Sequence, residues 1–278
     1  MDVIHTVAEL RARLAHEPGN ALVPTMGNLH EGHIRLVESI RPQSACTVVS
    51  IFVNRLQFGP REDFDKYPRT FASDCAKLAA AGCDVVFAPD EAEIYPEPQT
   101  YTVEPPEIAN ILDGAVRPGH FRGVATVVLK LFNMVAPRAA IFGKKDYQQC
   151  IVLNNMARQL ALPIRIILAE TVRAPDGLAL SSRNGYLSAP ERAEAPQLHA
   201  TLLRVATEVH AGKRDYRRIE LSAMAHLAER GWQPDYVAIR RRTDLMPPLE
   251  GDAELVVLGA AKLGATRLID NLELAAPA

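Results

Sequence analysis

The chain has 278 residues, of which 48% are apolar and 23% charged, a composition that suits buried cores and excludes a disordered protein. This length is comfortable for two domains. The 31 lysines and arginines are balanced by 33 aspartates and glutamates, so the chain lacks the basic excess typical of nucleic-acid-binding proteins. The densest basic runs, residues 217–218 and 240–242, are interpreted as solvated surface or local ion pairs.

The cysteines and the N-terminus predict a protein of a reducing cytoplasm. No two cysteines have C-x-x-C spacing, so neither a disulfide framework nor a zinc site is expected, and burial as small apolar residues is predicted. Residues 1–5 lack the basic start and apolar run of a signal peptide. No apolar stretch reaches 18 residues, so no membrane span is expected. The cysteines are Cys46, Cys75, Cys83 and Cys150.

Short apolar segments alternate with helical patterns from residue 21 to residue 169. Strands that are apolar on both sides are buried on both faces, so the alternation predicts a parallel sheet with helices on both faces. Ligands of such sheets bind beyond the carboxyl ends of the strands, so functional residues are expected just after Val23, Val53 and Phe142. The predicted strands are residues 21–23, 45–53, 85–88, 139–142 and 164–169. The predicted helices are residues 34–40, 70–81, 122–135 and 146–161.

The remainder of the chain predicts a smaller α+β domain. Helices are expected at residues 190–209 and 219–229, and strands at residues 236–239 and 255–258. The Ala-Pro-Asp-Gly sequence of residues 174–177 is a turn signal, so the domain boundary is expected beside it. We predict a first domain of residues 1–172 and a second of residues 173–278.

The first candidate site follows the strand at residues 21–23 and precedes a helix. It is the octapeptide Met26-Gly27-Asn28-Leu29-His30-Glu31-Gly32-His33. Its glycines allow close backbone approach to a ligand, and its two imidazoles near a helix N-terminus favour a phosphate anion. A zinc-protease H-E-x-x-H motif is excluded, because only Gly32 separates Glu31 from the second histidine.

Neutral amides follow the next strand. Asn54 and Gln57 suit the recognition of hydroxyl groups and of a carboxylate. Tyr67 either lines the same pocket or simply packs, and the sequence leaves both alternatives open.

Two further segments carry charges and small donors suited to ATP. In Gly143-Lys144-Lys145-Asp146, Lys145 is the candidate phosphate ligand and Asp146 a candidate partner for ribose hydroxyls. Lys144 by itself is expected to be a solvated surface lysine. In Leu180-Ser181-Ser182-Arg183, small donors followed by an arginine can clamp a phosphate.

Together these segments resemble the pantothenate synthetase (pantoate–β-alanine ligase) family, within the nucleotidyltransferase superfamily that carries HIGH-type motifs. The resemblance covers essentially the whole chain, and the combination and order of the motifs are highly specific. The motifs are residues 24–33, 50–65, 67–70, 119–124, 142–149, 176–188 and 268–271.

The resemblance implies a Rossmann-like N-terminal domain, a smaller C-terminal domain that closes over ATP, a homodimer and a requirement for Mg²⁺. It implies that residues 26–33 form the first ATP-binding segment, with His33 as proton donor. Gln57 would hold pantoate and later β-alanine, and Gln149 would hold pantoate. Residues 143–146, the backbone at Val172 and residues 180–183 would complete the ATP site.

Two positions depart from the family pattern. Arg55 stands where the family usually has proline, which adds a charge near the acid pocket and frees a backbone N–H. Asn28 replaces a common alanine, a minor change.

The resulting hypothesis is an acyl-adenylate ligase. Pantoate's carboxylate would attack the α-phosphorus of ATP, and the amine of β-alanine would then displace AMP. His30, His33, Lys145, Ser181, Ser182 and Arg183 are expected to offset the developing negative charge. One alternative is a nucleotidyltransferase for a phosphate-bearing acceptor, disfavoured by the neutral Gln57 and Gln149. Another is a catalytically idle nucleotide-binding protein, disfavoured because His33, Lys145 and Arg183 are all present.

Overall fold

The computed structural model describes residues 1–17, 19–60, 62 and 64–275. These residues form two compact units, which we call the N-terminal unit (residues 1–143 and 152–170) and the C-terminal unit (residues 144–151 and 171–278). Within the described ranges, no helix combines the length and the apolar character needed to cross a membrane.

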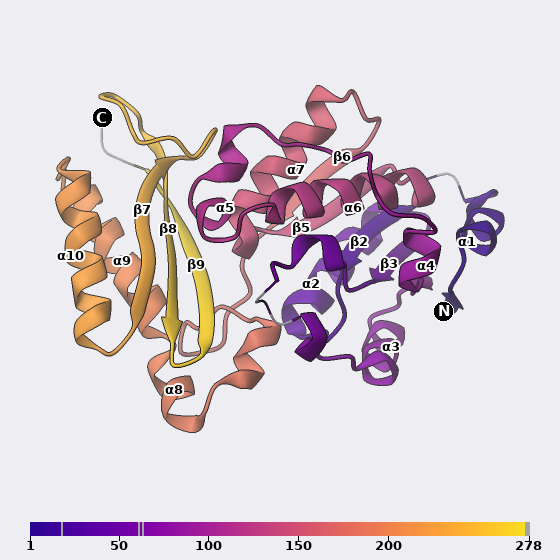
Figure 1. Ribbon diagram of the computed structural model, residues 1–278, viewed down its shortest axis with the longest axis horizontal. Coiled ribbons are helices and arrows are strands. Elements are labelled where there is room, and N and C mark those ends of the chain that lie inside the picture. The colour runs from indigo at the N-terminus through magenta and orange to yellow at the C-terminus, as the bar shows by residue number, and fades with distance from the viewer. Residues whose placement is uncertain (18, 61, 63, 276–278) are drawn as a thin grey trace. The chain divides into compact units, whose positions relative to one another are not determined.

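The N-terminal unit is built on six parallel strands in the order β1-β4-β3-β2-β5-β6 (Figure 1). The chain passes from the central strand β2 to β3 and β4 on one side, and later to β5 and β6 on the other. The order therefore reverses between β2 and β5, the kind of switch point where open parallel sheets bind ligands beyond the strand ends. The strands are β1 (Asp2–Ile4), β2 (Ala21–Thr25), β3 (Thr47–Ile51), β4 (Val85–Phe87), β5 (Ala139–Gly143) and β6 (Arg165–Ala169).

Alternate residues of the central strands serve the two faces of this sheet. Val23, Val49 and Ile141 share one buried cluster with Leu36 and Val37 of the helix that follows β2. Leu22, Val48 and Ala140, which point to the opposite face, are also buried, which explains why these strands are apolar without alternation. The helices are α1 (Val7–Leu14), α2 (Glu31–Ile40), α3 (Phe71–Ala80), α4 (Glu91–Ile94), α5 (Asp113–Val116), α6 (His120–Val135) and α7 (Tyr147–Gln159).

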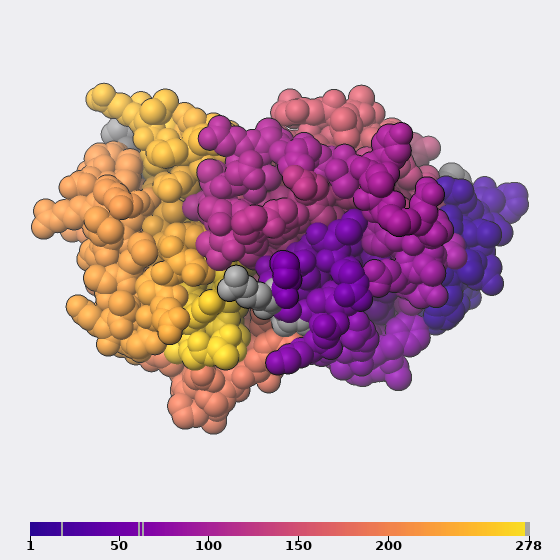
Figure 2. All heavy atoms as spheres, viewed as in Figure 1, coloured from indigo at the N-terminus to yellow at the C-terminus, as the bar shows by residue number. Residues whose placement is uncertain are grey.

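The C-terminal unit packs helices on a three-stranded antiparallel sheet in the order β7-β8-β9. Gly259 lies within β8, where a Cβ atom would lie 3.1 Å from a side-chain carbon of Leu202 and 3.2 Å from one of Leu198. Glycine thus permits the close approach of a helix to the strand. Helices α9 and α10 pack against this sheet, and the residues of α10 are part of the orange surface in Figure 2. The elements are α8 (Ala189–Glu194), α9 (Gln197–His210), α10 (Tyr216–Glu229), β7 (Gln233–Arg241), β8 (Glu254–Leu263) and β9 (Thr266–Ala275).

Short 3₁₀ helices occupy several connections. They are η1 (Arg41–Gln43), η2 (Arg55–Gln57), η3 (Phe64–Lys66), η4 (Glu107–Asn110), η5 (Lys144–Asp146) and η6 (Ser182–Tyr186). Arg61 and Asp63, which belong to the motif at residues 50–65, lie outside the described residues.

Most predicted elements are confirmed, including the parallel sheet and the smaller second sheet. The single helix predicted at residues 190–209 is wrong, because the chain breaks into α8 and α9 around Pro196, whose ring removes a backbone N–H and clashes within a helix. The prediction also missed β1, α1 and β9. The runs at residues 217–218 and 240–242 form ion pairs, as expected: Arg217 and Arg240 with Glu220, Arg241 with Asp244, and Arg242 with Glu273.

Candidate active site

The turn between β2 and α2 holds its two histidines in a reciprocal hydrogen-bonded pair. His30 immediately precedes α2, and its Nδ1 accepts a hydrogen bond from the Gly32 N–H at 3.1 Å. The Nδ1 of His33 in turn accepts from the His30 N–H at 3.4 Å. The ring centroids lie 4.1 Å apart. The two imidazoles therefore lie side by side at a helix N-terminus, as their spacing predicts.

These bonds determine which ring nitrogen carries the proton. A backbone N–H can only donate, so both Nδ1 atoms are acceptors, and each neutral ring carries its proton on Nε2. Nε2–H is then the group that His30 and His33 can each offer to a phosphate oxygen. The backbone N–H groups and the dipole at the start of α2 also favour an anion. The turn is therefore built to bind negative charge.

Helix α3 fixes this turn from outside the motif. Gly27 and Asn28 have φ angles of 80° and 50°, in the left-handed region. The buried carboxylate of Asp74 accepts from the N–H groups of Asn28 at 2.9 Å and Leu29 at 2.8 Å. Lys77 Nζ donates to the Leu29 carbonyl at 2.6 Å. The sequence motif does not predict either residue, because both lie in a helix more than forty positions away.

The turn after β3 contains a fully buried amide, Asn54. Its Nδ2 donates to the Gly123 carbonyl at 3.1 Å and to Gln57 Oε1 at 3.0 Å. Its Oδ1 accepts from the Leu56 N–H at 3.4 Å and the Tyr95 hydroxyl at 2.7 Å. In this arrangement both donors and both acceptor positions of Asn54 are used within the protein. These bonds give Asn54 a role in holding Gln57, and its contact with substrate stays a prediction.

The same bonds orient the amide of Gln57. The Gly123 carbonyl requires a donor, so Asn54 presents its NH₂ group, and Gln57 must present Oε1 to that group. Gln57 Nε2 then lies 3.3 Å from Met26 Sδ, which is only a weak acceptor. Gln57 is thereby linked to the first residue of the histidine octapeptide, and its Nε2–H is suited to a stronger acceptor such as a carboxylate.

Two residues near this turn, Tyr67 and Arg55, contact other side chains of the protein. Tyr67 is 5% exposed and packs edge-on against Phe58, with centroids 6.0 Å apart, which favours the packing alternative. Arg55 Nε lies 3.1 Å from a Glu91 carboxylate oxygen, and its guanidinium lies 4.0 Å from the centroid of Phe64. Its charge is therefore paired on an exposed surface.

In the C-terminal unit, the Lys-Lys-Asp segment forms η5 and leads into α7. The expectation of a solvated Lys144 is wrong: its side chain is 16% exposed, and Nζ lies 3.1 Å from Glu273. Tyr147 also donates its hydroxyl proton to Glu273, at 2.9 Å. Burial alone would raise the pKa of Glu273, but these two hydrogen bonds and nearby positive charge hold it below its usual value. Lys145 Nζ lies 3.8 Å from the exposed Asp146.

The other predicted ATP-binding segment is the end of a tight hairpin. The Leu180 N–H donates to the Val172 carbonyl at 3.0 Å, so the two predicted backbone positions lie side by side. Ser181 Oγ accepts from the Arg183 N–H at 3.3 Å, at the start of η6. Ser181, Ser182 and Arg183 thus follow directly from the hairpin.

Two consecutive residues of β9 connect these segments. Asp270 accepts two hydrogen bonds from Arg173, at 2.6 and 2.8 Å, beside the hairpin. Asn271 Nδ2 donates to the carbonyls of Lys144 and Lys145, at 2.8 and 2.9 Å. The C-terminal motif therefore anchors both groups of predicted ATP-binding residues in this unit, a role that sequence analysis did not assign.

The predicted site residues divide between the two units. Binding of one ATP by both groups remains a prediction. The N-terminal unit carries Met26, Gly27, Asn28, Leu29, His30, Glu31, Gly32, His33, Asn54, Gln57, Tyr67 and Gly143. The C-terminal unit carries Lys144, Lys145, Asp146, Gln149, Val172, Leu180, Ser181, Ser182 and Arg183.

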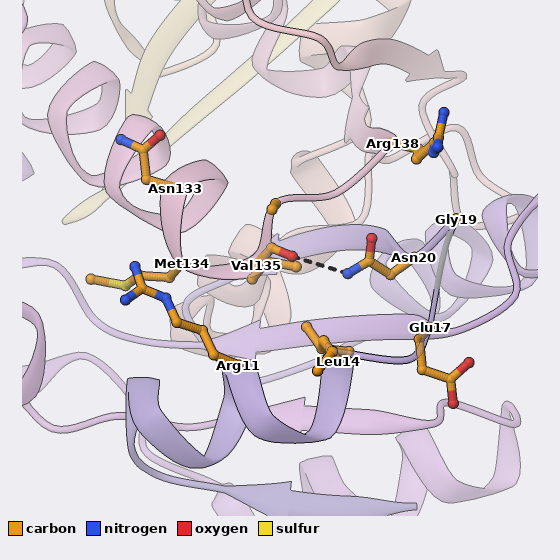
Figure 3. A pocket seen from close by; sticks show the side chains of 11 residues that line it. Arg11, Leu14, Glu17, Gly19, Asn20, Asn133, Met134, Val135 and Arg138 are labelled. Carbon is orange, nitrogen blue, oxygen red and sulfur yellow. Dashed lines mark hydrogen bonds between the residues drawn. The ribbon is translucent and has the colours of Figure 1, made fainter.

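A separate pocket of about 360 Å³ opens at the other end of the N-terminal sheet (Figure 3). It is lined by residues that precede β2 and β5, such as Asn20 and Arg138, and by the ends of α1 and α6. Asn20 Nδ2 donates to the Val135 carbonyl at 3.0 Å beside it. It contains none of the predicted site residues and lies at the amino edge, away from the edge where parallel sheets bind ligands.

The residues present fit a Mg²⁺ ion carried on ATP. No three or more His, Cys, Asp or Glu side chains cluster as metal ligands among the described residues. Mg²⁺ usually keeps several waters and binds substrate phosphates with one or two carboxylates, so it needs no such cluster. The exposed Asp146 is one carboxylate within the predicted ATP-binding run.

Comparisons with known proteins agree over the length of the chain. A pantoate-beta-alanine ligase family model matches residues 2–273. A pantothenate synthetase from Nitrosospira multiformis is 57% identical over 274 residues, covering 99% of this chain and 98% of that protein. The crystal structure of a pantothenate synthetase from Thermus thermophilus matches with a TM-score of 0.93 and 44% identity, over 98% of this chain and 99% of that one. A pantoate-beta-alanine ligase from Francisella tularensis, complexed with beta-gamma ATP and beta-alanine, matches with a TM-score of 0.83 and 32% identity, over 98% and 97%.

Proposed function

The chain belongs to the pantoate-beta-alanine ligase family, and we propose that it carries out the family's reaction with the turns after β2 and β3 and with residues 144–149 and 180–183. It is a ligase that condenses (R)-pantoate with β-alanine, using ATP, to give pantothenate, AMP and pyrophosphate. The side chains of both units serve the two steps of that reaction in different ways.

The first step forms a pantoyl-adenylate. A carboxylate oxygen of pantoate bonds to the α-phosphorus of ATP, and the bond from that phosphorus to the bridging oxygen breaks to release pyrophosphate. Negative charge grows on the leaving group. The Nε2–H groups of His30 and His33 suit this charge in the N-terminal unit, and Lys145 and Arg183 suit it in the C-terminal unit. The family resemblance gives His33 as the proton donor, and in this arrangement its Nε2–H would supply that proton as a hydrogen bond to an oxygen of the leaving pyrophosphate.

In the second step, β-alanine reacts with the pantoyl group of the adenylate. The amine of β-alanine bonds to the acyl carbon, the bond to the AMP oxygen breaks, and a proton leaves the amine. Gln57 and Gln149 are neutral, so they can bind the hydroxyl and carboxylate oxygens of pantoate without the strong attraction that a cationic pocket would have for phosphates. The Nε2–H of Gln57, which faces the weak acceptor Met26 Sδ, supports this assignment.

Three further properties belong to the proposal. Mg²⁺, bound with ATP, would lower the charge of the triphosphate, with Asp146 as a candidate protein ligand. A cytoplasmic location is supported by the free thiols of Cys46, Cys75, Cys83 and Cys150. A homodimer is expected from the family resemblance, and light scattering of the purified chain tests it.

The observation that carries the proposal is the reciprocal hydrogen-bonded pair of His30 and His33 at the start of α2. The test is exchange of labelled pyrophosphate into ATP. We expect exchange only when pantoate is present, because the adenylate is the species that pyrophosphate attacks in reverse. Exchange without pantoate, exchange driven by a phosphate-bearing acceptor, or ADP as the product would refute the mechanism.

A further inference from the structure

The Gly-His-Phe-Arg-Gly-Val motif at residues 119–124 has no part in the chemistry assigned so far. It begins α6, and α6 packs directly against η2 in the turn after β3. A Cβ atom on Gly123 would lie 2.2 Å from the Leu56 carbonyl oxygen and 2.6 Å from the Gln57 nitrogen. Only glycine therefore allows this helix to approach the backbone that carries Gln57.

His120 holds the main chain of Gln57. Its Nδ1 lies 2.8 Å from the Gln57 carbonyl oxygen, and its Nε2 lies 3.0 Å from Arg117 Nη1. Arginine can only donate, so Nε2 is the acceptor and Nδ1 carries the proton that is donated to the carbonyl. This is the opposite tautomer to that of His30 and His33.

Arg117 is fixed in turn by a carboxylate. It donates to both oxygens of Glu62, at 2.8 and 2.5 Å, and to the Gln57 carbonyl at 3.4 Å. The Arg117 and Glu62 side chains are only 18% and 24% exposed. A planar two-point bond of this kind specifies orientation as well as charge.

Burial of the ring, followed by the charge of Arg117, lowers the pKa of His120 to about 4. The ring is therefore neutral near pH 7 and acts there as a hydrogen-bond donor and acceptor. Its Nδ1–H stays available to the Gln57 carbonyl throughout. Because Asn54 holds the side chain of the same glutamine, Gln57 is fixed at both ends.

We propose that His120 and Arg117 are positioning residues that hold the Gln57 main chain, so that its side-chain amide meets pantoate in one orientation. The proposal rests on the role of Gln57 in the proposed function. Neither residue is assigned a contact with substrate. Their effect should appear in the affinity for pantoate and not in that for ATP.

Two substitutions of His120 separate the roles of its ring nitrogens. His120→Asn places an amide N–H near the position of Nδ1 and keeps the bond to Gln57. His120→Gln places its amide near Nε2 and loses that bond. We expect the KM for pantoate to rise by about tenfold or more in His120→Gln and to stay within about threefold in His120→Asn. The KM for ATP should stay within about twofold in both.

Arg117→Gln is expected to raise the KM for pantoate in the same way. The matched control is Arg122→Gln, because Arg122 lies in the same motif but its guanidinium pairs with the exposed carboxylate of Glu104.

A Gln57→Ala background provides the decisive comparison. If His120 acts through Gln57, adding His120→Gln to Gln57→Ala should raise the KM for pantoate by less than about twofold. Thermal unfolding of each variant checks that the chain is folded.

The outcomes distinguish the inference from the proposed function. Pyrophosphate exchange that depends on pantoate, with normal pantoate KM in both His120→Gln and Arg117→Gln, overturns the inference alone. An equal rise of the pantoate KM in His120→Asn and His120→Gln also overturns it. So does a rise in the Gln57→Ala background as large as the rise that His120→Gln causes in the unsubstituted chain. Exchange that is independent of pantoate in the unsubstituted chain overturns the proposed function instead.

Discussion

At the scale of single residues, the protein controls its imidazoles through backbone hydrogen bonds. In His30 and His33, backbone N–H donors occupy Nδ1, so Nε2 carries the proton. In His120 a backbone carbonyl accepts from Nδ1. The two ring nitrogens of each residue consequently have different functions, and substitutions that mimic one nitrogen at a time can separate them.

For His33, this difference predicts opposite effects of two amides. His33→Asn places an oxygen near Nδ1 and should keep the helix cap, whereas His33→Gln places an amide near Nε2 and should keep part of the phosphate contact. We expect His33→Asn to lose about 10²- to 10³-fold in kcat, and His33→Gln clearly less. His33→Gln should instead lose about 1 kcal/mol of stability. Steady-state kinetics and denaturant unfolding measure the two effects, and normal turnover by both variants would remove His33 from the mechanism.

For His120, the lowered pKa predicts a pH dependence of stability. The folded state has a pKa of about 4, and an unfolded chain would bind the proton at about 6.5. Between pH 6.5 and pH 4 the unfolded state binds more protons than the folded state. The stability that the neutral His120 ring contributes is therefore fully present above pH 6.5 and is lost as the pH falls from 6.5 to 4.

Between pH 7 and pH 5, the unsubstituted chain should therefore lose about 2 kcal/mol more of its unfolding free energy than His120→Asn loses. Urea unfolding of both proteins at both pH values measures this difference. The contributions of the other titrating groups cancel, because both proteins contain them. Equal losses in the two proteins would show that His120 titrates normally in the folded state.

At the scale of elements, the predicted sites depend on partners that arrive from elsewhere in the chain. The β2–α2 turn depends on Asp74 of α3, and the Lys144–Lys145 backbone depends on Asn271 of β9. Spacing along the sequence identifies a motif but not its distant anchor. A signal existed for Asp74, because it shares the buried face of an amphipathic helix with Leu78, four residues later, where a carboxylate must have partners.

Asp74→Asn tests this anchor. One oxygen can still accept a hydrogen bond, but the new NH₂ group faces a backbone N–H, so one buried donor is left without a partner. We expect the free energy of unfolding to fall by about 1–3 kcal/mol and the KM for ATP to rise. Glu38→Gln, which alters an exposed ion pair on α2, serves as the control and should change stability by less than about 1 kcal/mol. An unchanged KM for ATP in Asp74→Asn would contradict the assignment.

At the scale of the whole molecule, sequence patterns predict the sheet better than they predict its surroundings. Apolar runs such as residues 45–53 locate the buried strands, because burial on both faces leaves few other compositions. Strand β9 escapes prediction, because Asp270 and Asn271 interrupt its apolar pattern with side chains that support the site. The break at Pro196 escapes it because the helical periodicity continues on both sides.

The C-terminal unit contains a buried ion pair between Arg173 and Asp270, and its loss should destabilise that unit. Burial alone would raise the pKa of Asp270, but the nearby His199 ring, together with the hydrogen bonds and the charge of Arg173, holds it below its usual value. Arg173→Met would leave this carboxylate, 3% exposed, without its arginine partner, with the His199 ring 3.4 Å away.

We expect Arg173→Met to cost about 3–5 kcal/mol of stability. The single tryptophan, Trp232, is buried in the core of the C-terminal unit, so its fluorescence reports unfolding there. Lys213→Met, which removes an exposed ion pair with Glu208, is the control and should cost less than about 1 kcal/mol. Equal stability losses in the two variants would contradict a special role for the buried pair.

The pocket at the amino edge of the N-terminal sheet matters for inhibitor discovery. It lies beyond Ala21 and Ala139, whereas the histidine turn begins beyond Thr25, about 13 Å farther along β2. A small molecule bound there would raise the melting temperature by mass action without touching any residue assigned to pantoate, β-alanine or ATP. Thermal-shift screens against this enzyme should therefore count a stabilising compound as an inhibitor only after competition with pantoate or ATP has been measured.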